Sequence, residues 1–96
     1  MNKILIIEDD LEINALLADF LKEKGYAVHC QYDGLHVLDF LNKEKIDLII
    51  LDIMLPYRSG DIILSDVRKK FTIPVIIISA KETTQNKIDL LRLGAD

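Results

Sequence analysis

Residues 46–52 read Ile46-Asp47-Leu48-Ile49-Ile50-Leu51-Asp52, an apolar run that stops at a carboxylate. Two further runs are similar: residues 4–7 are followed by Glu8, and residues 74–78 are followed by Ser79. Near-continuous runs of isoleucine, leucine and valine are typical of parallel strands that are buried on both faces. The carboxyl ends of such strands share one crevice, where ligands bind. The sequence therefore predicts an acidic cleft with a hydroxyl group beside it.

Helical segments alternate with the apolar runs. Apolar side chains recur at helical spacing in residues 11–24, and Gly25 is a typical residue to end that helix. Asp9 and Glu12, which are three residues apart, predict its start as a capping pair. This alternation predicts an α/β fold with a doubly wound parallel sheet. The expected strands are residues 3–7, 27–31, 48–51 and 75–78, and the expected helices are residues 11–24, 35–42, 62–70 and 84–93.

The composition bounds the class of protein. The chain has 96 residues, enough for one small domain, and its 50% hydrophobic and 29% charged content is globular. A net charge of -4 argues against nucleic-acid binding by this segment alone. No apolar stretch reaches the roughly 20 residues of a membrane span, and the single Cys30 cannot form an intramolecular disulfide. We therefore expect a cytoplasmic protein without membrane contact.

The acidic residues at the ends of the expected strands at residues 3–7 and 48–51 predict a metal site. If those two strands are neighbours, Glu8 and Asp9 face Asp52 across the crevice. Carboxylates at such short range raise each other's pKa, and a divalent cation removes that conflict. Mg²⁺ prefers a site with few protein ligands, all of them oxygen. Asp9 and Asp10 could instead be ordinary acids at a helix start, a reading that is stronger for Asp10.

The chemistry of such a site points to phosphorus. A carboxylate beside a bound metal can act as a nucleophile and form an aspartyl phosphate, which gives Asp52 a role. The hydroxyl group of Ser79 could donate a hydrogen bond to a phosphoryl oxygen, or it could simply cap the end of its strand.

Four motifs in order resemble the receiver domain of bacterial two-component response regulators, most closely the branch with a winged-helix DNA-binding domain. They are Ile4-Leu5-Ile6-Ile7-Glu8-Asp9-Asp10, Asp52-Ile53-Met54-Leu55-Pro56 with Gly60, Ser79-Ala80-Lys81, and Leu93-Gly94-Ala95-Asp96. The resemblance implies a flavodoxin-like sheet with strand order 2-1-3-4-5. It also implies that Asp52 accepts a phosphoryl group from the phosphohistidine of a sensor histidine kinase. Such a domain is a phosphoacceptor and switch that assists its own phosphorylation, not an enzyme in the usual sense.

The resemblance also implies the roles of individual residues. Mg²⁺ would be held by Asp9, by Asp52 and by the backbone carbonyl of Met54, with Glu8 in contact through water. Ser79 would be the switch hydroxyl.

The family's fifth strand and fifth helix would follow residue 96. Residues 1–96 are therefore expected to be an incomplete receiver domain, with strand order 2-1-3-4 and without the lysine that ends the fifth strand. DNA would be contacted only through a C-terminal output domain outside this chain. The fourth strand would lie at the edge of the sheet, where it and the helix at residues 84–93 would permit self-association.

Two other functions stay open at this point. A Mg²⁺-dependent aspartyl-phosphate phosphohydrolase also uses an aspartate at a strand end, but it needs a second aspartate two residues later as a general acid. That position is Met54, which cannot transfer a proton. The other alternative is an interaction module that is not phosphorylated.

The helix at residues 11–24 has a wide apolar stripe. In the resembling family this helix contacts the kinase, so we expect Ile13, Asn14 and Leu17 to form part of a docking surface. Packing under the fifth helix of the intact fold is the alternative for Leu17 and Leu21.

Overall fold

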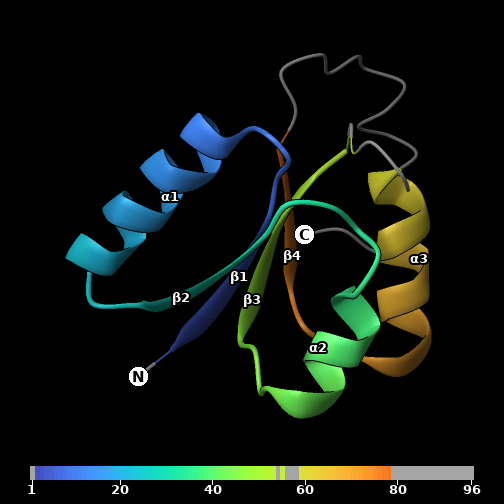
Figure 1. Ribbon diagram of the computed structural model, residues 1–96. Helices are drawn as coiled ribbons and strands as arrows, with labels where there is room; N and C mark the ends of the chain where they lie inside the picture. Colours follow the sequence, from blue (N-terminus) through green and yellow to red (C-terminus); the bar gives the residue numbers. More distant parts are fainter. Residues whose placement is uncertain (1, 54, 56–58, 79–96) are drawn as a thin grey trace.

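The computed structural model describes residues 2–53, 55 and 59–78, and these residues form a parallel sheet with helices on both faces (Figure 1). The strand order is β2-β1-β3-β4, as predicted, and all three strand pairs are parallel. None of the described helices is long and apolar enough to cross a membrane. The elements are β1 (Lys3–Ile7), α1 (Leu11–Glu23), β2 (Ala27–Gln31), α2 (Val37–Lys43), β3 (Leu48–Asp52), α3 (Gly60–Lys70) and β4 (Val75–Ile78).

The predicted strands lie within one residue of the observed ones, but two helices start elsewhere. Strand β3 extends to Asp52, which lies opposite Ile78 of β4. Helix α2 begins two residues later than predicted, because the Asp33 side chain accepts the backbone N–H of Leu35 and forms a turn there (3.0 Å). Helix α3 begins two residues earlier, at Gly60. The helix predicted at residues 84–93 lies outside the described residues.

Both faces of the sheet are buried, which explains the continuous apolar runs. Successive side chains of a strand point to opposite faces, so the last four residues of β1 divide between two apolar clusters. Leu5 and Ile7 belong to the larger cluster, beneath α2 and α3. Ile4 and Ile6 belong to a smaller cluster beneath α1, with Ala18 and Ile50. A polar residue at either kind of position would be costly, and the strands carry polar groups mainly at their ends.

The start of α1 corrects one prediction. The Asp10 carboxylate accepts the backbone N–H groups of Glu12 (3.0 Å) and Ile13 (3.1 Å) and is therefore the N-cap. The predicted pair of Asp9 and Glu12 is wrong, and the helix-start interpretation of Asp10 is right. Gly25 has a φ of 94° and ends the helix as expected.

The apolar stripe of α1 is split between the core and the surface. Asn14 and Ala18 are the buried residues of this helix, whereas Ile13, Leu16 and Phe20 are exposed. Asn14 is only 1% exposed, and its Nδ2 donates to the carbonyl oxygens of Glu8 (3.0 Å) and Gln31 (3.3 Å). The expectation that Asn14 belongs to a docking surface is wrong, because this side chain is committed to two backbone carbonyls.

We predict that Asn14→Ala destabilises the domain by about 1–3 kcal/mol, because two buried carbonyl groups lose their donor. Urea unfolding measures the change. Leu16→Ala is the matched control on the same helix, since Leu16 is 70% exposed and its loss should cost under about 0.5 kcal/mol. Equal losses for the two variants would contradict the structural role of Asn14.

Candidate functional site

The register between β1 and β3 places two acidic residues side by side. Ile7 lies opposite Leu51, so the residues that follow them lie side by side: Glu8 directly after β1, and Asp52 as the last residue of β3. Hydrogen bonds to the outer strands β2 and β4 fix the backbone at Glu8 and just after Asp52. The N–H of Glu8 donates to the carbonyl of Gln31 (3.0 Å), and the N–H of Ile53 donates to the carbonyl of Ile78 (3.2 Å). The two carboxyl groups therefore start from fixed positions on neighbouring strands.

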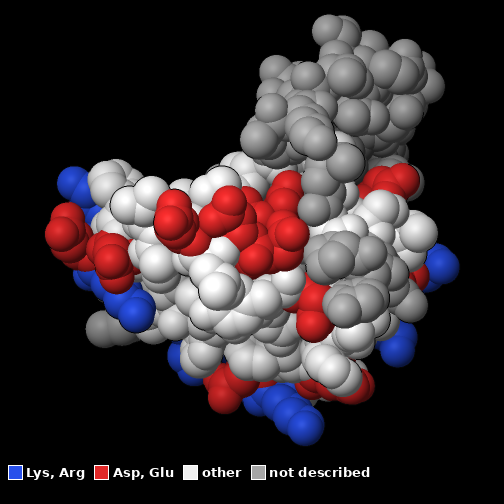
Figure 2. Space-filling model, turned by 45° about the horizontal axis from the view of Figure 1, so that its top comes forward, with Lys and Arg blue, Asp and Glu red and all other residues white. Residues whose placement is uncertain are grey.

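Three carboxylates meet at this edge. One oxygen from each of Glu8, Asp9 and Asp52 lies within 4.8 Å of the others. Glu8 and Asp52 are 4% and 6% exposed, whereas Asp9 is exposed. Figure 2 shows acidic side chains gathered in the middle of the face formed by this end of the molecule. The structure thus brings together the three acidic residues that the sequence placed here, while Met54 and Ser79 lie outside the described residues.

Burial and repulsion act most strongly on Glu8. Burial, a hydrogen bond with the Asp52 carboxylate, and the negative charges nearby raise the pKa of Glu8 to about 8. The N–H of Asp10, 3.4 Å from Glu8 Oε2, opposes this shift only partly. Near neutral pH Glu8 is therefore largely protonated, which lowers the negative charge of the cluster. A divalent cation would remove the same conflict, and an all-oxygen donor set suits Mg²⁺.

Gly60 holds the chain beyond Asp52 in place. Its N–H donates to the carbonyl of Ile53 (2.9 Å), so the first turn of α3 lies directly against the end of β3. A Cβ atom at Gly60 would lie 2.6 Å from both the Asp52 carbonyl oxygen and Ile53 Cα. Only glycine permits this approach of two backbone segments.

Sequence reasoning missed the two residues that support the backbone of the site. Asn14 fixes the carbonyl of Glu8, and Gly60 fixes the segment after Asp52. A signal for Asn14 was present, because asparagine is a poor helix former and stands here inside an apolar stripe. The sequence indicated Gly60 only as a loop residue and as part of the motif that begins at Asp52.

Comparison with known proteins identifies the family to which this chain is similar. Residues 4–96 match the response regulator receiver domain. The receiver domain of the Francisella response regulator 1452 is 35% identical with a TM-score of 0.92, and the match covers 100% of this chain and 80% of that one. The BeF3-activated receiver domain of Klebsiella pneumoniae RstA is 33% identical with a TM-score of 0.93, over 98% and 80% of the two chains. A two-component response regulator from Clostridium difficile is 29% identical with a TM-score of 0.95, over 100% and 79%.

The chain therefore belongs to the family of response regulator receiver domains. The general role of this family is that of a phosphoacceptor switch in two-component signalling, and its members bind Mg²⁺ at an acidic pocket. This chain has an acidic cluster of Glu8, Asp9 and Asp52 whose oxygens lie close enough together to hold a metal ion.

We predict that Glu8→Gln stabilises the metal-free domain increasingly as the pH rises. Below the ordinary pKa of 4.5, Glu8 is protonated in the folded and the unfolded chain. Between 4.5 and about 8 only the unfolded chain releases the proton, so the wild type loses stability with rising pH, and above 8 the loss is complete. Each pKa unit corresponds to about 1.4 kcal/mol, so the gain should reach a few kcal/mol.

Urea unfolding with a chelator at pH 5, 7 and 9 measures this gain. Added Mg²⁺ should narrow the difference at high pH, because a cation favours the ionised form of Glu8. A gain that is the same at pH 5 and pH 9 would rule out a buried, protonated Glu8.

Proposed function

We propose that this chain is a phosphorylated receiver in which Asp52 accepts a phosphoryl group from the phosphohistidine of a sensor histidine kinase. The carrying observation is the position of Asp52, which is buried at the end of β3 within 4.8 Å of two other carboxyl groups. Family membership supports the same role. In the reaction a carboxylate oxygen of Asp52 attacks phosphorus, an O–P bond forms, and the P–N bond breaks. Its electron pair returns to the imidazole of the donor.

Individual residues of this chain would have separate roles in metal binding and phosphoryl transfer. Asp9 and Asp52, with the backbone carbonyl of Met54, would hold Mg²⁺, and Glu8 would act through water. When bound, the metal supplies positive charge against the repulsion between the phosphoryl group and the carboxylates. Asn14 and Gly60 would keep the backbone beneath Glu8 and Asp52 from shifting. Ser79 would donate its hydroxyl hydrogen to a phosphoryl oxygen and act as the switch.

The partners follow from the same proposal. The exposed part of α1, with Ile13, would contact the kinase. Leu17 is partly buried against the smaller core cluster, and Asn14 is no longer part of that surface. An output domain outside this chain would bind DNA, and a cytoplasmic location fits the family. Within the described residues β4 lies at the sheet edge, and Ile76 is 43% exposed there. Self-association through β4 and the segment at residues 84–93 is a further part of the proposal.

Phosphorylation at Asp52 is tested with a small phosphodonor and Mg²⁺ on the full-length protein. We expect the wild type to gain the mass of one phosphoryl group and Asp52→Asn to gain none, because the amide is not a nucleophile of this kind. Asp47→Asn is the control, since Asp47 lies before β3 at the other end of the sheet, where it accepts the backbone N–H of Lys3 (2.8 Å). A mass gain retained in Asp52→Asn would refute the assignment. Beryllofluoride, which activates the Klebsiella relative, offers a second readout that needs no phosphodonor.

Mg²⁺ binding separates Asp9 from its neighbour Asp10. Asp9→Ala should weaken Mg²⁺ binding about tenfold or more, as measured by calorimetric titration, because the cation loses a charged ligand. Asp10→Ala should leave the affinity nearly unchanged and cost about 1 kcal/mol of stability, because Asp10 caps α1. A loss of affinity as large in Asp10→Ala as in Asp9→Ala would contradict the proposed ligand set.

A further inference from the structure

A hollow lies at the opposite end of the sheet from the carboxylates. It has a volume of about 600 Å³ and is lined by residues 41–46 and 70–73. These residues end α2 and α3 and immediately precede β3 and β4, whereas the acidic cluster lies beyond the carboxyl ends of β1 and β3. The volume falls within the range of about 300–1,000 Å³ typical of ligand pockets. We call this feature the amino-end hollow.

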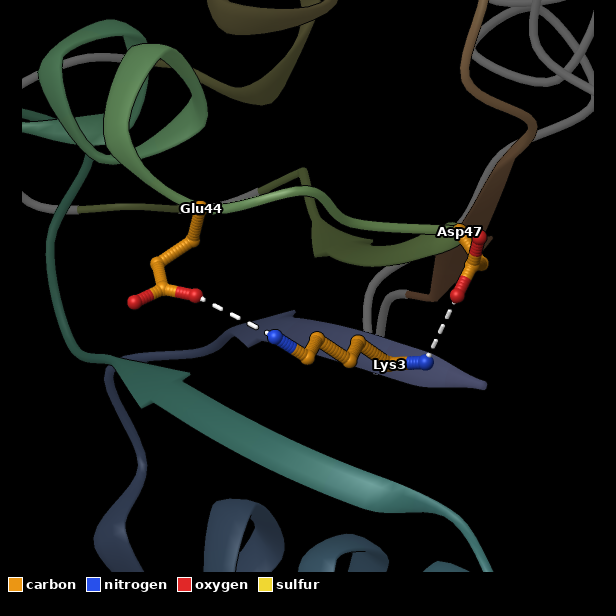
Figure 3. Close-up of polar contacts among 3 residues, drawn as sticks. All are labelled: Lys3, Glu44 and Asp47. Carbon is orange, nitrogen blue, oxygen red and sulfur yellow. Dashed lines mark hydrogen bonds and ion pairs between the residues drawn. The ribbon is translucent and has the colours of Figure 1, made fainter. Parts of the chain in front are cut away.

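The amino-end hollow is positively charged. Lys43, Lys45 and Lys70 line it, and Glu44 is its only acidic lining residue among those the structure describes. Glu44 is already engaged: its Oε2 lies 3.4 Å from Lys3 Nζ, and the backbone N–H of Lys3 donates to Asp47 (Figure 3). Within the described part of the chain, the three lining lysines make no ion pair. The hollow therefore presents three positive charges on a chain whose net charge is -4.

Helix dipoles account for only part of this arrangement. Lys43 and Lys70 are the last residues of α2 and α3, where the macrodipole favours a cation. Lys45 lies beyond the end of α2 and gains little from it. The floor is apolar, because Phe71 and Ile73 are only half-buried where they pack against the larger core cluster. An apolar floor with a cationic rim is complementary to a ligand that carries both acidic and apolar groups.

We propose that the amino-end hollow docks an acidic segment of a partner protein. Aspartate or glutamate side chains of that segment pair with Lys43, Lys45 and Lys70, and one apolar side chain packs on Phe71 and Ile73. The rest of this acidic chain repels such a segment, so the charge of the hollow also selects the place where it binds. Rim ion pairs are exposed and screened by salt, so the contact is weak and sensitive to ionic strength.

The test uses the isotope-labelled full-length protein and a synthetic acidic peptide, Glu-Asp-Leu-Phe-Glu-Asp, observed by NMR. We expect saturable shifts of the amide signals of residues 43–46 and 70–73, with weaker binding at higher salt. An exposed ion pair contributes up to about fivefold in affinity. The triple variant Lys43→Gln, Lys45→Gln, Lys70→Gln should therefore bind at least tenfold more weakly.

A second triple variant, Lys22→Gln, Lys24→Gln, Lys69→Gln, changes the net charge equally but does not alter the hollow. It should bind within twofold of the wild type, as should Asp52→Asn, which separates this site from the proposed phosphorylation. Amide spectra of the free variants confirm that each is folded. The proposal is overturned if no saturable shifts occur, if the two triple variants lose affinity equally, or if inorganic phosphate alone gives the same shifts with the same affinity. Tighter binding of a single-stranded oligonucleotide at the same residues would also overturn it.

Discussion

Mutual repulsion among three carboxyl groups is the constraint on which the chemistry at the carboxyl edge of the sheet depends. The parallel pairing of β1 with β3 places Glu8 beside Asp52, and burial of both groups makes two negative charges there expensive. Burial and repulsion raise the pKa of Glu8 to about 8, so that a proton on Glu8 removes one of the negative charges. A divalent cation is the other answer available to the same oxygens. The site is thus balanced between two ways of neutralising its charge, and this balance suits a group that must receive a further anion.

The support for this edge comes from polar and steric contacts in the backbone. Asn14 donates to the carbonyls of Glu8 and Gln31, and so joins α1 to two strands. Gly60 brings α3 against the end of β3 so closely that no side chain fits. The acidic groups therefore lie on a rigid frame built from both sides of the sheet.

The sequence predicted the sheet well for a physical reason. A strand buried on both faces must be apolar at every position, and that requirement leaves an unbroken run that ends where the sheet ends, as at Asp52. Placing Glu8, Asp9 and Asp52 near one another needed only the order of β1 and β3. The predictions for Met54 and Ser79 rest on the family resemblance, since both residues lie outside the described part of the chain.

Predictions failed where single contacts decide. Two successive aspartates, Asp9 and Asp10, could each cap α1, and the backbone placed Asp10 at the cap position. The apolar periodicity of α1 predicted a wide stripe but not which part of it is buried. The helix lies on the sheet through Asn14 and Ala18, with Leu17 and Leu21 partly buried, and leaves Leu16 exposed. Periodicity alone cannot identify which part of a wide stripe faces the sheet.

The central position of β1 also affects how the chain reaches this structure. Ile4 pairs with Val28 of β2 and with Leu48 of β3, so β1 can complete its hydrogen bonds only after both of these later strands have been synthesised. Contacts of this sequence separation slow folding, because the intervening chain must be ordered before the pairing is gained. During synthesis the isoleucine-rich β1 is exposed before its neighbouring strands exist, and such exposed strands favour aggregation. The strand that organises the finished sheet is therefore also the segment most in need of protection while the protein is being made.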